Sequence, residues 1–216
     1  MKKSLIIGSI CLCLIACTDN ADNTGNNKAK EKTTTETSNS TGFQHSFPTL
    51  FNSLKQKNVT ADSFAITETG QLEPFPSSPI NMQHLQPFKK LLIYNSDSTQ
   101  AIDLFSYNYI LTEKEGKPVA EAAEPDTEIA LLNFKKNTRK RIWYSGPATA
   151  IVDAKWVGPN EVELLSIQED EKGERKPVIW KISLTKNTID TYKYNHPVAL
   201  TATDYLNKRF NSINFR

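Results

Sequence analysis

A sharp change in composition near residue 42 limits where this chain can build a hydrophobic core. The segment from Thr18 to Gly42 is rich in Thr, Asn, Ser and Lys, and it contains no aromatic residue and no aliphatic residue larger than Ala. Such a segment cannot offset its loss of conformational entropy by burying apolar surface. The sequence therefore predicts a disordered tether within residues 17–42. It places the whole core in residues 43–216, a length that suits one domain.

Most of this domain consists of short segments rich in β-branched and aromatic residues, separated by turn residues such as Lys136-Asn137-Thr138 and Gly158-Pro159-Asn160. The expected strands are 90–94, 101–111, 128–134, 139–144, 151–156, 161–168, 177–184 and 188–194. Short helices are expected near 47–57, from Ser78-Pro79 to Pro87, and over 203–212. The pattern thus predicts a mainly β domain with a few flanking helices.

A weak internal repeat runs through the expected strands. The segment 132–138 (LNFKKNT) aligns with 182–188 (ISLTKNT) at an offset of 50 residues, and 103–106 aligns with 163–166 at an offset of 60. A longer loop over 112–127 accounts for the difference. We therefore expect two four-stranded units, roughly 88–144 and 151–194, in an open antiparallel meander that the helices cover at its ends. Each unit resembles a β-propeller blade in architecture. An unrelated β-sandwich is the alternative.

The start of the chain carries an apolar run from Leu5 to Ala16, which follows Met1-Lys2-Lys3 and ends at Leu14-Ile15-Ala16-Cys17. A helix of this length reaches about 18 Å, short of the roughly 30 Å hydrocarbon core of a bilayer. The pattern resembles a bacterial lipoprotein precursor with its lipobox. The resemblance implies a signal peptide over residues 1–16. It also implies lipid on the Cys17 sulfur and often an acyl chain such as palmitate on the new amine. An ordinary signal peptide with an incidental cysteine is the alternative.

Lipoprotein processing would also fix the location and chemistry of the mature chain. The resemblance implies a lipid anchor in the cell envelope, and Thr18 after Cys17 favours the outer membrane if the host has one. Cys11 and Cys13 leave with the signal peptide, so no disulfide or thiol site is expected. Without Lys2 and Lys3, the mature chain would have 24 basic and 24 acidic side chains, so their charges would cancel. This balance argues against a nucleic-acid partner, which requires a basic face.

Signals for catalysis are weak throughout the sequence. The three histidines are far apart and lack metal-ligand spacing, and no nucleophile elbow or phosphate-binding glycine loop is present. Glu161 and Glu163 alternate on one expected strand and could form an acid/base pair, although solvated carboxylates are common on such strands. We therefore expect no catalytic residue, no metal and no cofactor.

One basic cluster and three tryptophans are the candidate contact residues. The cluster spans 135–141, and its Arg139 and Arg141 are candidates for contact with anionic lipid head groups or an acidic glycan. A solvated hairpin tip is the alternative. Trp180 and Trp156 are expected in the core. Trp143 follows the two arginines in the alternation, so it is a candidate for stacking on a sugar ring.

Three functional classes fit these observations. The favoured one is a non-catalytic envelope lipoprotein, anchored in the membrane, that binds or scaffolds a protein or glycan partner. The second is a self-assembling structural subunit, in which sheet edges pair between copies. The third is a hydrolase of envelope polymers, which needs two acidic side chains converging in a cleft.

Overall fold

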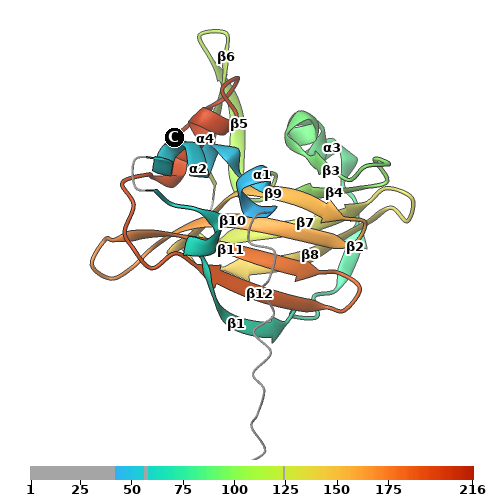
Figure 1. Ribbon diagram of the computed structural model, residues 1–216. Coiled ribbons are helices and arrows are strands. Elements are labelled where there is room, and N and C mark those ends of the chain that lie inside the picture. Colours follow the sequence, from blue (N-terminus) through green and yellow to red (C-terminus); the bar gives the residue numbers. More distant parts are fainter. Residues whose placement is uncertain (1–41, 56–57, 124) are drawn as a thin grey trace, which may run out of the picture. The chain divides into compact units, whose positions relative to one another are not determined.

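The computed structural model describes residues 42–55, 58–123 and 125–216, which form three β-sheets and several short helices (Figure 1). These residues belong to one compact unit. The α-helices are α1 (Gly42–Ser46), α2 (Pro48–Leu54), α3 (Met82–Leu85) and α4 (Ala202–Arg209), and the 3-10 helices are η2 (Ala61–Ser63) and η3 (Gln86–Leu91). In the described ranges, no helix is long and apolar enough to cross a membrane.

Two five-stranded antiparallel sheets make up most of the domain. Sheet A has the strand order β1-β12-β11-β10-β9, and sheet B has the order β2-β8-β7-β4-β3. The strands of sheet A are β1 (Ala65–Gln71), β9 (Thr149–Gly158), β10 (Glu161–Glu169), β11 (Arg175–Ser183) and β12 (Thr188–Lys193). The strands of sheet B are β2 (Ser77–Pro79), β3 (Ile93–Tyr94), β4 (Gln100–Asp103), β7 (Thr127–Asn133) and β8 (Thr138–Ser145). The expectation of a mainly β, antiparallel fold is confirmed.

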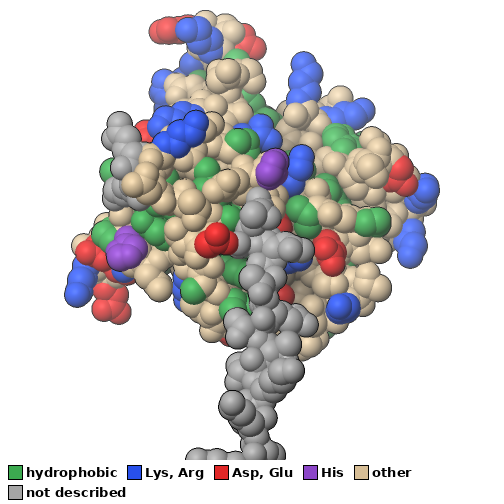
Figure 2. All heavy atoms as spheres, viewed as in Figure 1, with side chains coloured by type: hydrophobic (Ala, Val, Ile, Leu, Met, Phe, Trp, Pro, Cys, Tyr) green, Lys and Arg blue, Asp and Glu red, His purple; other side chains and the backbone are tan. Residues whose placement is uncertain are grey.

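A smaller sheet C holds the hairpin β5 (Tyr109–Lys114) and β6 (Lys117–Ala122), with β13 (Asn214–Phe215) pairing parallel to β6. The hairpin projects upward in Figure 1, and its tip carries basic and acidic side chains together (Figure 2). The predicted loop over 112–127 is therefore wrong, because 109–122 form this hairpin around Glu115 and Gly116, both of which have positive φ angles.

The repeated sequence segments adopt the same local structure. Strands β7 and β8 are joined through Asn137, and β11 and β12 through Asn187, with φ angles of 51° and 58°. In both turns, a side chain accepts the backbone N–H three residues later: Asn133 from Lys136 at 2.9 Å, and Ser183 from Lys186 at 3.4 Å. Asn tolerates positive φ because its short polar side chain bonds locally. The Lys-Asn-Thr recurrence thus marks two equivalent hairpins.

Sheet A is covered on both faces. On its outer face Tyr192 lies against Phe43 of α1, with ring centroids 5.0 Å apart. Asp153 of β9 accepts hydrogen bonds there from the Tyr205 hydroxyl at 2.7 Å and from Arg209 Nε at 3.0 Å, which attaches α4. Figure 1 shows α1, α2 and α4 grouped on this side. These helices therefore lie on a face of sheet A, not at the ends of a meander.

The helix predictions are partly confirmed. The one-face pattern of 47–54 is right, since Phe47, Leu50, Phe51 and Leu54 are all buried. The helix expected to start at Ser78-Pro79 is wrong, because those residues pair with β8. The helix starts after Asn81, whose side chain accepts the His84 backbone N–H at 3.1 Å and so caps it.

The strand expected over 101–111 is interrupted by a turn. The Asp103 carboxylate accepts the backbone N–H groups of Phe105 and Ser106 at 3.1 and 3.0 Å. These bonds end β4 and allow β5 to start in another sheet. Strands β1, β2, β6 and β13 were not expected from the sequence.

Candidate functional site

A β-bulge on β8 separates the three candidate contact residues onto two faces of sheet B. Strict alternation would place Trp143 on the same face as Arg139 and Arg141. In the structure Arg141 is opposite Ala130 but Trp143 is opposite Ile129, so the register shifts between these pairs. The extra residue turns Trp143 toward the inner face of sheet B, against sheet A. The arginines stay on the outer face.

Trp143 contacts Trp180 of β11, with ring centroids 4.5 Å apart and planes inclined by 41°. Trp180 is only 3% exposed, so the expectation that it belongs to the core is confirmed. Trp143 is partly buried. Trp156 is also partly buried, and its indole Nε1 donates to the Ile93 carbonyl at 2.8 Å, which ties β9 to β3. The two sheets therefore pack on each other through aromatic side chains.

The Trp143–Trp180 pair lies in a groove of about 350 Å³, which we call the tryptophan groove. Its polar lining comes from three strands of sheet A: Glu68 and Gln71 on β1, Gln168 on β10, and Thr191 and Lys193 on β12. Aromatic surface with a few polar groups around it is the usual composition of a binding site. The groove can thus accept an apolar group while bonding its polar neighbours.

Buried polar atoms next to the groove lack a partner among the described residues. They are the Trp143 indole Nε1 and the hydroxyls of Ser145 and Ser166. Trp143 and Ser145 are two residues apart on β8, and Ser166 is two residues before Gln168 on β10. A buried polar group without a hydrogen bond costs free energy, about 1–3 kcal/mol. The Trp143 Nε1 is therefore a buried, unpaired donor of a residue that lines the groove.

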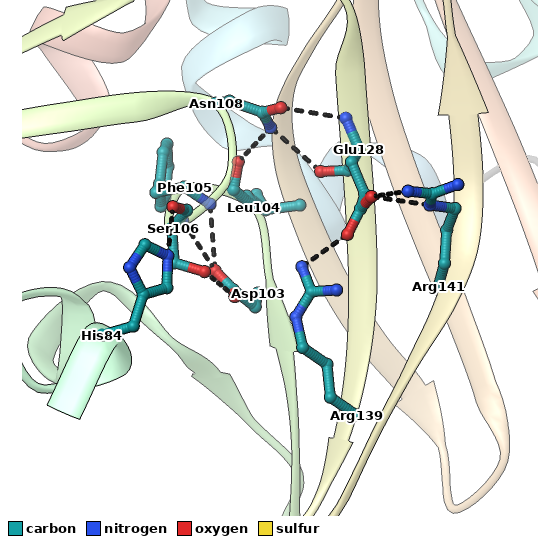
Figure 3. Close-up of polar contacts among 9 residues, drawn as sticks. All are labelled: His84, Asp103, Leu104, Phe105, Ser106, Asn108, Glu128, Arg139 and Arg141. Carbon is teal, nitrogen blue, oxygen red and sulfur yellow. Dashed lines mark hydrogen bonds and ion pairs between the residues drawn. The ribbon is translucent and has the colours of Figure 1, made fainter. Parts of the chain in front are cut away.

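The two arginines bind a buried carboxylate on the other face of sheet B (Figure 3). Glu128 is 2% exposed. Its Oε1 lies 2.5 Å from Arg139 Nη2, and its Oε2 accepts a hydrogen bond from Arg141 Nε at 2.6 Å. Asn108 holds the Glu128 backbone, donating to its carbonyl at 3.0 Å and accepting its N–H at 2.9 Å. The Arg141 guanidinium also lies 4.7 Å from the centre of the Tyr144 ring. The arginines are thus fixed by internal contacts while remaining partly exposed.

A serine, an aspartate and a histidine lie close together beside this cluster, but not as a catalytic triad. The Ser106 hydroxyl donates to Asp103, whereas His84 Nε2 donates to the Ser106 backbone carbonyl at 2.9 Å (Figure 3). The histidine thus contacts the Ser106 backbone and not its hydroxyl, and Ser106 is 4% exposed. His84 therefore links α3 to the turn after β4.

Of the acidic pair considered from the sequence, Glu163 lies under α1, whereas Glu161 is half-buried at the start of β10. Glu163 is 4% exposed, and burial raises the pKa of its carboxyl, against the opposing effects of the Ser46 hydroxyl and Lys181. Burial likewise raises the pKa of Asp153, and the nearby Arg209 opposes the shift. Both carboxylates are covered by helices on the outer face of sheet A. Within the described ranges, no group of three His, Cys, Asp or Glu side chains is placed to hold a metal ion.

Sequence reasoning missed most of the groove. Glu68, Gln168, Thr191 and Lys193 are isolated polar residues on strands far apart in sequence, and no local pattern links them. The predicted lipidation site, Cys17, lies outside the described residues, as do the predicted signal peptide and all of the predicted tether except Gly42, which begins α1. Comparison with protein-family models, curated proteins and solved structures finds no match for this chain.

Proposed function

We propose that this protein is a membrane-anchored lipoprotein of the bacterial cell envelope that binds a protein or glycan partner without catalysis. The lipobox Leu14-Ile15-Ala16-Cys17 supports the anchor. Lipid on Cys17 would hold the chain on the membrane, since each buried CH₂ contributes about 0.8 kcal/mol and two chains give stable anchoring. Thr18 favours the outer membrane in a host that has one. Residues 18–42 would separate the membrane from the domain.

The tryptophan groove is the observation that carries the binding role. Its aromatic pair and its polar lining provide both apolar contact and hydrogen bonding in one place. The Arg139–Glu128–Arg141 cluster is a second, weaker candidate surface. There both guanidiniums already contact a carboxylate, so an incoming anion would have to compete with Glu128.

We also propose that sheets A and B contain two copies of one blade-like unit. Strands β3-β4-β7-β8 and β9-β10-β11-β12 follow the same up-and-down order, and their last hairpins share the turn through Asn137 or Asn187. The β5–β6 hairpin is an insertion in the first copy. The proposal predicts that exchanging the two turn segments, 135–138 and 185–188, leaves the domain folded.

The anchor is tested by replacing Cys17 with Ser. The expected result is release of the protein from the membrane fraction and loss of labelling by radioactive palmitate. The matched control is Cys13→Ser, which lies within the predicted signal peptide and should leave both unchanged. Retention and labelling of the Cys17→Ser chain would contradict the anchor.

Partner binding is tested by photo-crosslinking in cells. A benzophenone amino acid replaces Lys193, an exposed lysine at the groove, or Lys172, an exposed lysine of the β10–β11 turn that does not line the groove. We expect a discrete adduct from position 193 that is absent from position 172. Identical adducts from both positions, or none from position 193, would contradict binding at the groove. Mass spectrometry of the adduct distinguishes a protein from a glycan.

A further inference from the structure

The four outer edges of sheets A and B differ in how they are protected. Sheet B ends in β2 and β3, which are only three and two residues long, and β2 ends at Pro79. On sheet A, β9 is contacted by α1, α4 and β3. The remaining edge, β1, is seven residues long, contains no lysine or proline, and is exposed at every residue except the half-buried Gly70. Short strands, prolines, lysines, bulges and covering elements normally block edges from pairing. The register of β1 shifts between Ile66 and Glu68, so the regular part of its edge is residues 68–71.

The free edge of β1 adjoins the tryptophan groove. Within the described part of the chain, β1 pairs only with β12, on one side. Its Glu68, Gly70 and Gln71 also line the groove. An edge strand beside a side-chain pocket is the arrangement by which proteins bind extended peptides: the backbone provides affinity and the pocket provides specificity. Figure 1 shows β1 as the outermost strand of this sheet, beside β12.

We infer that β1 is the docking strand for an extended peptide segment of another protein, which adds to sheet A and places a large apolar side chain in the tryptophan groove. The inference rests on the proposed function and names its partner class. A polypeptide repeats N–H and C=O groups at the spacing that an edge strand requires, whereas a glycan does not.

The charge of β1 argues for a different chain and against a second copy. Glu68 is the only charged residue of β1 and occupies the centre of the strand, 65–71. In a symmetric antiparallel pairing along the full strand, the two Glu68 carboxylates would lie directly opposite each other, and like charges there are destabilising. A foreign strand with Lys or Arg at that position would pair favourably. The expected partner segment thus carries a basic residue near the apolar one.

The test starts from phage-displayed random dodecamer peptides selected on the full-length chain in detergent. Synthetic copies of the selected peptides are then titrated by fluorescence anisotropy. We expect Glu68→Lys and Ile66→Lys each to weaken binding at least tenfold, because they put a positive charge on the edge. Matched controls on the β5–β6 hairpin are Glu113→Lys and Ile110→Lys. Ile66 and Ile110 are 54% and 56% exposed, so the substitutions are comparable.

Hydrogen exchange measured by NMR gives a readout specific to strand addition. In the free protein the amides of β1 that point away from β12 should exchange rapidly, and bound peptide should protect alternate residues of β1. Binding that is equal in wild type and Glu68→Lys, or that leaves these amides unprotected, overturns the inference. So does a concentration-dependent dimer that Glu68→Lys abolishes, since the second copy would then be the occupant.

The outcomes also separate this inference from the proposed function. A glycan adduct at position 193 that persists in Glu68→Lys would support a groove ligand and overturn strand addition. Absence of both the position-193 adduct and of selectable peptides contradicts the two proposals together. Protection of β1 by peptide, with loss of binding in Glu68→Lys, supports both.

Discussion

Removing the Trp180 side chain should strongly destabilise the domain, and part of the loss should depend on Trp143. Trp180 is 3% exposed, and replacing a buried Trp by Ala typically costs about 3–5 kcal/mol. At a urea m-value of about 2 kcal/mol/M, a loss of about 4 kcal/mol lowers the unfolding midpoint by about 2 M. The matched surface variant Lys136→Ala, in an exposed turn, should change the free energy of unfolding by less than about 0.5 kcal/mol.

A double-mutant cycle isolates the contact between the sheets. Trp143→Ala, Trp180→Ala and the double variant are unfolded in urea and followed by circular dichroism. Aromatic pairs contribute about 0.5–1.5 kcal/mol beyond their buried area. The sum of the stability losses of the two single variants should therefore exceed the loss of the double variant by about that amount. Wild-type stability in Trp180→Ala would refute the core assignment. A coupling near zero would refute the packing of sheets A and B through these two rings.

Three further sets of variants test other parts of the fold. Burial raises the pKa of Glu163 in the folded state, so the contribution of this residue to stability falls as the pH rises from about 4.5 through the raised pKa. Glu163→Gln should therefore stabilise the protein at neutral pH and flatten this part of the stability–pH curve. Thermal unfolding in a series of buffers measures both effects. Thr201 caps α4, and Thr201→Ala should cost about 1 kcal/mol in urea unfolding whereas Thr201→Ser should not. Asn137→Ala and Asn187→Ala should each lower the free energy of unfolding by about 1 kcal/mol, because both residues have positive φ, and Asn137→Gly should lower it less. A larger loss for Asn137→Gly than for Asn137→Ala would contradict the turn geometry.

Local signals in the sequence were sufficient for the hairpins between residues 127 and 193, but not for the β5–β6 hairpin, which was predicted as a loop. The strands from 127 to 193 were expected because turn residues and alternating apolar residues bound each one, and such turns form from neighbouring residues alone. The same is true of α2 and α4, whose apolar spacing is helical. The helix predicted to start at Ser78-Pro79 was wrong because a Ser-Pro pair fits both a helix start and an edge strand. Pairing with β8, which is distant in sequence, decides that these residues form a strand.

The groove depended on information that no local pattern contains. Strand β1 has polar, exposed side chains on both faces, so it shows no alternation of hydrophobicity, and it joins sheet A only by pairing with β12 far along the chain. The position of Trp143 depended on a bulge defined by the partner strand β7. A residue-by-residue alternation of β8 therefore assigned Trp143 to the wrong face. Edge strands and bulges are decided by tertiary pairing.

The anchoring of β13 has a consequence for the order of folding. Phe215 is 2% exposed and packs against Phe105, Tyr109 and Phe210, with ring centroids 5.1–6.0 Å apart within this group. Residue 215 is synthesised after every other member of this cluster, and its ring fills the space between α4 and the β5–β6 hairpin. A nascent chain, which grows from its amino end, therefore cannot complete the aromatic cluster until residue 215 has been added, although the strands of sheets A and B are made earlier.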